Sequence, residues 1–200
     1  AAAVAATNGL MQIGTYRFPP DGVPVPFIIE KEAEITSDPF TVTYTIRPDA
    51  AFNDGHPLTA ADYAFTYETI VNPKWTIANR KPYDLITGYE IINERTIKFT
   101  FSAPVPGYKK LFHIVLPKHD LEGKDWDTAW KDSVPVSNGP FKMESWERGQ
   151  QITFARNDHF FGDGPNLDRI VMRFVPESNT LLELLRSGEI DASDPQPQPE

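Results

Sequence analysis

The sequence contains no cysteine, no long apolar run and comparatively few basic residues, and each of these features excludes a class of protein. Without cysteine, disulfide bonds, thiolate metal sites and cysteine nucleophiles are excluded. No apolar stretch approaches the roughly 20 residues that a transmembrane helix needs. Lysine and arginine number 19 against 28 aspartates and glutamates, which gives a net charge of −9. General nucleic-acid binding, which requires a basic face, is therefore not expected.

Catalytic and metal-binding motifs are also missing. No two histidines stand four residues apart as a helical metal site requires, and the HExxH pattern does not occur, so we expect isolated histidines at His56, His113, His119 and His159. The acidic residues between 120 and 127 lack the order of an EF-hand loop. There is no GxSxG nucleophile motif. We therefore expect no enzyme activity, no bound metal and no cofactor.

What the sequence does contain is typical of a folded protein with many short connections. Hydrophobic residues make up 40% and aromatic residues 12% of the chain, enough for a packed core, and 19 prolines argue against a helical bundle. Residues 41–46 alternate between Thr and apolar side chains, which predicts a strand. The Asn53-Asp54-Gly55 sequence predicts a turn. Thr59, three residues before Asp62, predicts a capped helix that ends at Asn72-Pro73.

Further elements follow the same alternation of strands and helices. Residues 96–101 predict a second strand, with the preceding YEIINER segment as the other arm of a hairpin. A proline-rich loop then leads into a short helix near residue 108, and IVLPKH (114–119) predicts a brief buried strand. The polar segment 122–134 predicts a surface helix or loop and a domain border. The C-terminal part predicts strands at 151–155 and 169–175 and a helix capped by Ser178 and closed by Gly188. The fold class is mixed α/β.

Three groups of motifs carry a resemblance to a known family. The segment VTYTIRPDAAFNDGHPLTAADYAFTYETI matches a strand, DG turn and capped helix of the form W/F-x-DG-x-P-x-T-A-x-D. It is followed by a hairpin and proline loop, YEIINERTIKFTFSAPVPGYKKLF, and by the order SNGPFKMESW, HFFG and ESNTLLELLRSGEID. Together with NGL and DGVPVP near the N-terminus, these motifs resemble the extracellular solute-binding proteins of the oligopeptide, dipeptide and nickel ABC importers (family 5). Two departures are mild: SNGP replaces the usual GTGP, and Phe160-Phe161 replaces Tyr-Trp.

The resemblance implies a periplasmic-binding-protein type II fold in which two lobes close on a solute. Residues 1–130 would form the extra α+β domain of the peptide-binding subfamily, with the start of lobe one at its N-terminal edge. Residues 131–200 would form part of lobe one leading into the hinge. Family members are considerably longer, with a second lobe after the GEID segment, so we expect this chain to be a fragment that lacks that lobe.

The resemblance also implies function and candidate ligand contacts. The expected function is extracytoplasmic binding of a solute, foremost a peptide, for uptake by an ABC importer; a nickel chelate, sugar, opine or haem is the alternative ligand, and a hydrolase is a remoter alternative. The partners would be the solute and the membrane permease subunits, and the protein would be a monomer in the periplasm or a lipoprotein at the cell surface, anchored only through a lipid outside this chain. Ligand-binding candidates are Asn8, Leu10, Tyr83 and Asn138; for the last three, core packing or a turn role is the competing interpretation.

Overall fold

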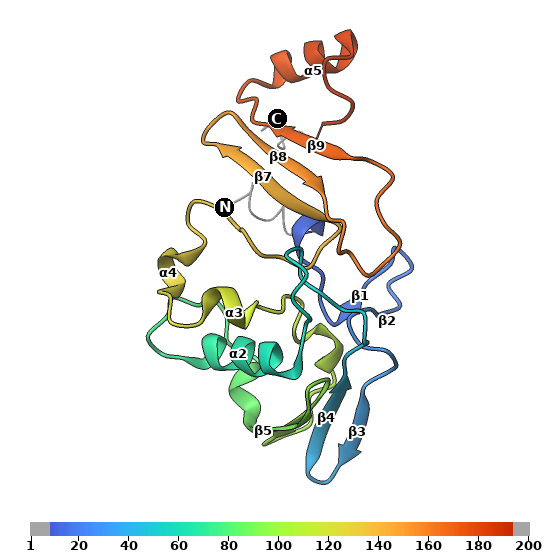
Figure 1. Ribbon diagram of the computed structural model, residues 1–200, viewed down its shortest axis with the longest axis vertical. Coiled ribbons are helices and arrows are strands. Elements are labelled where there is room, and N and C mark those ends of the chain that lie inside the picture. The colour runs from blue at the N-terminus through green and yellow to red at the C-terminus, as the bar shows by residue number, and fades with distance from the viewer. Residues whose placement is uncertain (1–8, 194–200) are drawn as a thin grey trace, which may run out of the picture.

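The computed structural model describes residues 9–193, which form three antiparallel sheets and a small number of helices (Figure 1). The largest sheet has the order β3-β4-β6-β5, the second has the order β7-β8-β9, and the smallest pairs β1 with β2. The strands are β1 (Tyr16–Arg17), β2 (Val25–Pro26), β3 (Glu34–Ser37), β4 (Phe40–Thr45), β5 (Ile86–Asn93), β6 (Thr96–Phe101), β7 (Phe141–Glu147), β8 (Gln151–Arg156) and β9 (Arg169–Arg173). The predicted mixed α/β class is confirmed.

The helices are mostly short. They are α2 (Ala60–Val71), α3 (Lys118–Leu121), α4 (Trp126–Ala129) and α5 (Ser178–Ser187), with 3-10 turns η1 (Tyr83–Leu85) and η2 (Tyr108–Lys110). Within residues 9–193, none of them combines the length and the apolar character that crossing a bilayer requires.

Helix α2 forms where local sequence signals predict it. Asp62 accepts hydrogen bonds from the Thr59 backbone N–H at 2.8 Å and from the Thr59 hydroxyl at 2.9 Å, which fixes the first turn. The helix ends at Val71 because the following Asn72 precedes a proline and has extended backbone angles. This element is therefore determined by contacts within its own segment.

The main hydrophobic core lies between α2 and the four-stranded sheet. Alternate residues of β4 and β6 point into it, and Tyr44, Ile97 and Phe99 are fully buried there. The ring of Phe112 packs on Tyr44 and Phe99 from the other side, with centroid distances of 5.7 and 4.9 Å. Strands β4 and β6 thus each contribute an aromatic ring, Tyr44 and Phe99, to a cluster that Phe112 completes.

A second, smaller core belongs to the sheet β7-β8-β9. Its buried members are Met11, Phe141, Ile152 and Phe154. Residues packed around it include Leu10 and Val134. The N-terminal segment therefore contributes apolar side chains to a sheet that is formed by residues more than a hundred positions away.

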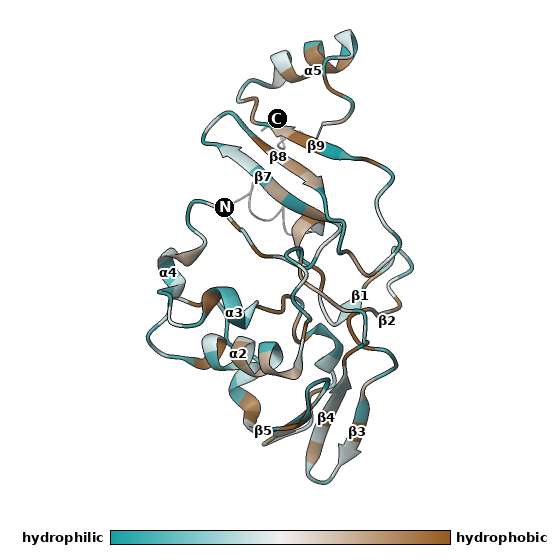
Figure 2. Cartoon of the chain, in the orientation of Figure 1, coloured by the Kyte–Doolittle hydropathy of each residue, from teal (hydrophilic) through white to brown (hydrophobic). Residues whose placement is uncertain are grey.

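Apolar side chains remain exposed at the end of the molecule formed by β9 and α5 (Figure 2). Val171 on β9 and Leu182 and Leu185 on α5 are all exposed. The helix carries alternating polar and apolar bands, the pattern of a helix that packs one face against a neighbour.

Two local predictions are corrected by the structure. The IVLPKH segment is not a strand: residues 114–117 are irregular, with Val115 and Leu116 buried, and Lys118 and His119 are the first two residues of α3. Its backbone bonds to side chains of α2 instead of a neighbouring strand, because Leu116 N–H donates to the Thr66 hydroxyl and Lys118 N–H to the Asp62 carboxylate. In α5, Ser178 is the first helical residue and Glu177 occupies the N-cap position. The left-handed Gly188 that closes this helix is confirmed, with φ of 75°.

Candidate functional site

Two segments far apart in sequence cross at the junction of the two hydrophobic cores. Residues 9–15 run against residues 137–140, and Gly139 N–H donates to the Met11 carbonyl at 2.7 Å. Beyond the crossing, Thr15 N–H donates to the Phe112 carbonyl at 2.9 Å, which ties the same segment to the larger core. The N-terminal segment therefore connects both cores through its own backbone.

Asn138 clamps this crossing. Its carboxamide accepts a hydrogen bond from Ile13 N–H at 3.0 Å and donates one to the Ile13 carbonyl at 2.8 Å. The side chain is 0% exposed. Asn138 thus pairs with one residue as a neighbouring strand would, and in this arrangement both ends of its amide are already used. Its predicted contact with ligand stays a prediction.

The structure brings Leu10 and Asn138 together, because Gly139 packs directly on the backbone of Leu10 and Met11. Residues 9–11 are helical, and the first strand within the described residues, β1, begins at Tyr16. The Leu10 side chain is half-buried and packs against the smaller core. Asn8 lies outside the described residues.

Tyr83 is placed apart from that pair, in the larger core. Only 5% of it is exposed, and its hydroxyl accepts a 2.6 Å hydrogen bond from Phe112 N–H. Burial raises the pKa of Tyr83 to about 12, against a smaller opposing effect of the hydrogen bond. This is the environment of a packing residue whose polar tip is satisfied.

Two residues at the crossing were missed by sequence reasoning. Gln12 is 8% exposed, yet neither its amide nitrogen nor its amide oxygen has a hydrogen-bond partner among residues 9–193, and the buried Ser137 hydroxyl likewise has none there. A buried amide without partners costs about 1–3 kcal/mol, so such groups call for an explanation. The only sequence signal was position: Gln12 lies two residues beyond Leu10.

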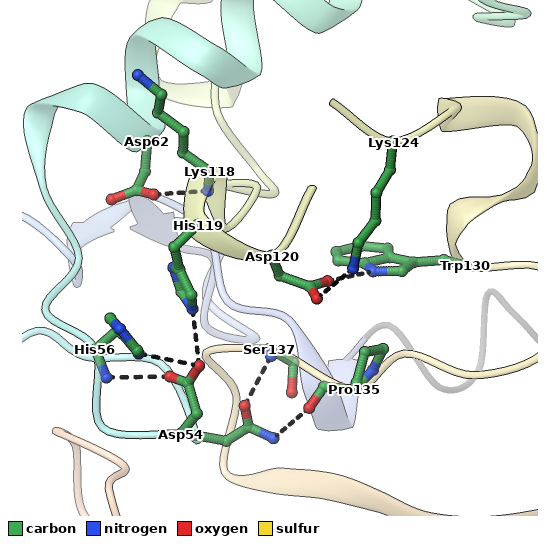
Figure 3. A network of polar contacts seen from close by, with 11 residues as sticks. Asp54, His56, Asp62, Lys118, His119, Asp120, Lys124, Trp130, Pro135 and Ser137 are labelled. Carbon is green, nitrogen blue, oxygen red and sulfur yellow. Dashed lines mark hydrogen bonds and ion pairs between the residues drawn. The ribbon is translucent and has the colours of Figure 1, made fainter. Parts of the chain in front are cut away.

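The DG turn of residues 53–56 links the larger core to the crossing (Figure 3). The Asn53 side chain accepts from Ser137 N–H at 3.0 Å and donates to the Pro135 carbonyl at 3.1 Å. Asn53 N–H in turn donates to the Ser137 carbonyl at 2.8 Å. The turn predicted from sequence therefore serves as a connector, which its local pattern did not reveal.

The same turn brings together two histidines that the sequence predicted to be isolated. The rings of His56 and His119 stack with centroids 4.1 Å apart and planes 18° apart. Both face Asp54, whose carboxylate lies 2.7 Å from His119 Nε2 and 3.2 Å from His56 Nδ1 (Figure 3). Partial burial alone would raise the pKa of Asp54, but hydrogen bonds from the His56 backbone and the His119 ring outweigh it and lower that pKa.

Comparison with known proteins identifies the family. Residues 23–200 match the model of the bacterial extracellular solute-binding proteins, family 5 (middle region). The chain is 29% identical over 199 residues to the oligopeptide-binding protein OppA of Bacillus subtilis, an alignment that covers 89% of this chain and 36% of OppA.

Solved structures agree with this match. The periplasmic EDTA-binding protein EppA superimposes with a TM-score of 0.86 at 28% identity, over 94% of this chain and 38% of EppA. NikZ from Campylobacter jejuni, in complex with Ni(L-His), gives a TM-score of 0.85 at 27% identity, over 91% of this chain and 37% of NikZ. The chain thus spans a little over a third of the length of these proteins. With a family model that matches most of its residues, the chain belongs to the bacterial extracellular solute-binding proteins of family 5.

Proposed function

We propose that this chain is part of a solute receptor for an ABC importer, which captures a peptide between two lobes and carries out no covalent chemistry. Family membership and the similarity to OppA support this proposal. In this view residues 1–130 form the extra domain with the start of lobe one, and residues 131–200 form part of lobe one. Most buried members of the larger core lie before residue 130 and most of those of the smaller core lie after it, which supports that division, while Val136 and Phe161 join the larger core and Met11 the smaller one.

The observation that carries the proposal furthest is the buried amide of Gln12 at the crossing, which has no hydrogen-bond partner among residues 9–193. A peptide bound in extended form offers a row of backbone N–H and C=O groups, and a carboxamide can bond one of each. Gln12 lies between Leu10 and the Ile13–Asn138 clamp, so its backbone position is held on both sides. We place the wall of the solute site here, with Leu10 and Asn138 as the neighbouring candidates.

Replacing Gln12 by Leu tests this placement in the complete protein that contains this sequence. Removing an unpaired buried amide at nearly constant volume leaves stability unchanged or raises it. If the amide bonds a peptide, the same change lowers peptide affinity about tenfold, measured by calorimetry with a peptide library. Unchanged peptide affinity in a stable Gln12→Leu variant would remove Gln12 from the site. No binding of any peptide by the unaltered protein would refute the peptide assignment.

A second ligand class has specific support. The likeness to EppA and NikZ, whose structures are those of an EDTA-binding protein and of a Ni(L-His) complex, favours a metal chelate as the alternative solute. A thermal-shift panel with peptides and chelates separates the two, because stabilisation grows with the ratio of free ligand to its dissociation constant. The 200 residues alone should bind either class only weakly, and micromolar binding by them would contradict the two-lobe arrangement.

Location and partners follow from the same proposal. A receptor of this family acts outside the cytoplasmic membrane, as a monomer that docks on permease subunits, and attachment to the membrane would come from a lipid anchor outside these 200 residues. The excess of acidic side chains argues against a nucleic-acid partner. Cell fractionation of the producing organism tests the location, and recovery in the cytoplasmic fraction would contradict it.

A further inference from the structure

Asp54, His56 and His119 form a cluster that has the composition of a transition-metal site. Each offers one ligand atom, and these atoms all lie within 4.8 Å of one another. We propose that these three residues bind a divalent transition-metal ion such as Zn²⁺, with solvent completing the coordination shell. Two imidazoles and one carboxylate are a ligand set that zinc sites use when they keep an open position.

The three candidate ligand atoms lie close enough together for one ion to bridge them after small rotations of the side chains. His119 Nε2 and His56 Nδ1 both lie against the same carboxylate oxygen of Asp54, so two ring nitrogens and one oxygen gather at one place on the surface (Figure 3). Zinc bonds of roughly 2.0–2.2 Å to nitrogen and oxygen place tetrahedral ligand atoms about 3.4 Å apart. The observed separations of 2.7 and 3.2 Å are shorter than that value, and rotation of the exposed side chains would open the cluster to admit the ion.

The surroundings hold the ligands in position. The second oxygen of Asp54 accepts a hydrogen bond from the His56 backbone N–H at 3.0 Å, which orients the carboxylate. Phe52 packs edge-on against the His119 ring, with centroids 5.4 Å apart, and the His56 ring stacks on the His119 ring. Partners that orient first ligands in this way contribute strongly to metal affinity.

The three side chains are available to bind an ion. Asp62, which lies close enough to His119 to influence it, already accepts hydrogen bonds from Thr59 and Lys118. His56 and His119 keep 60% and 28% of their side chains exposed, and Asp54 keeps 32%, so an ion can reach them from solvent. The site joins the turn before α2 to α3, two elements that are 65 residues apart at Asp54 and His119.

The test is calorimetric titration of the purified protein, without an affinity tag and freed of metal, with zinc chloride. We expect one Zn²⁺ per chain, a melting temperature that rises with zinc, and an affinity at least about tenfold lower in His56→Gln and His119→Gln. His159→Gln is the matched control: this ring is exposed and touches the same turn at Gly55, but it lies outside the cluster, so zinc binding should not change.

Ring-nitrogen NMR identifies the ligands directly. Zinc should shift the Nδ1 signal of His56 and the Nε2 signal of His119 while the rings of His113 and His159 stay unchanged. Because His56 is the most exposed of the three, His56→Gln is the variant that keeps its fold even if His119→Gln does not. Absence of saturable binding, or binding by His56→Gln equal to that of the unaltered protein, would overturn the proposal.

Discussion

Two asparagine side chains at the junction each accept one hydrogen bond from a backbone N–H and donate one to a backbone carbonyl, but they differ in burial. The pair therefore offers a matched experiment. Asn138 bonds both backbone groups of Ile13 and is fully buried, whereas Asn53 bonds Ser137 N–H and the Pro135 carbonyl from a half-buried position. Truncation to alanine removes two hydrogen bonds in each case. The difference between the two variants in the free energy of unfolding then measures how much burial adds to the cost of losing these bonds.

The magnitudes follow from hydrogen-bond energetics. Each bond contributes a net 0.5–1.5 kcal/mol or so, and a backbone group left buried without a partner costs about 1–3 kcal/mol. We therefore expect Asn138→Ala to lower the free energy of unfolding by about 2–4 kcal/mol. Asn53→Ala should cost about 1 kcal/mol, because water replaces the lost partners at a half-exposed site. Against a total stability of roughly 5–15 kcal/mol, the first loss is large.

The assay is urea unfolding followed by far-ultraviolet circular dichroism, with the midpoint and slope compared for the two variants and the unaltered protein. An Asn53→Ala variant that loses as much stability as Asn138→Ala would show that burial does not set the cost. A loss below about 1 kcal/mol for Asn138→Ala, at unchanged slope, would refute the clamp itself.

Three further predictions concern the junction and the larger core. Gly139→Ala should prevent correct folding or lower the melting temperature sharply, because a Cβ at position 139 would lie 2.4 Å from the carbonyl carbon of Met11. Gly164→Ala is the control: no atom lies within 4 Å of a Cβ at that position, so its melting temperature should not change. Tyr83→Phe removes the acceptor of Phe112 N–H and should cost about 1–3 kcal/mol in urea unfolding; a neutral effect would contradict the assigned bond. Partial desolvation would raise the pKa of Glu32, but hydrogen bonds from neighbouring lysine and tyrosine side chains outweigh it and lower that pKa. The contribution of Glu32 to the free energy of unfolding is therefore fully present above its unfolded pKa. It disappears as the pH falls through the lower folded pKa. Glu32→Gln should therefore lose less stability than the unaltered protein on acidification below about pH 4.5, and parallel acid-unfolding curves would contradict this.

The elements that sequence predicted correctly are those determined by their own residues. Helix α2 begins and ends where Thr59, Asp62 and Asn72-Pro73 place it, because its capping contacts span only a few positions. Strands β4 and β6 follow from period-two alternation for the same reason. Local chemistry of this kind can be read without knowledge of the fold.

The features that sequence missed depend on distant partners. The 114–119 segment has the composition of a strand, but its N–H groups bond to Thr66 and Asp62 on α2. The spacing rule for histidine ligands tests only positions on one helix, and so it could not pair His56 with His119. The clamp between Ile13 and Asn138 joins residues 125 positions apart, and nothing near either residue indicates it.

The junction between the two cores is held by directional hydrogen bonds in addition to apolar packing. Residues 137–140 accept or donate backbone hydrogen bonds to Asn53 on one side, to Met11 on another and to Asn157 on a third. Apolar contacts tolerate small sliding movements, whereas hydrogen bonds weaken steeply when their distances and angles change. The two cores should therefore move as one body. If the protein closes on a solute as proposed, that motion has to be taken up by other segments, and the backbone at Gln12 keeps its position at the junction.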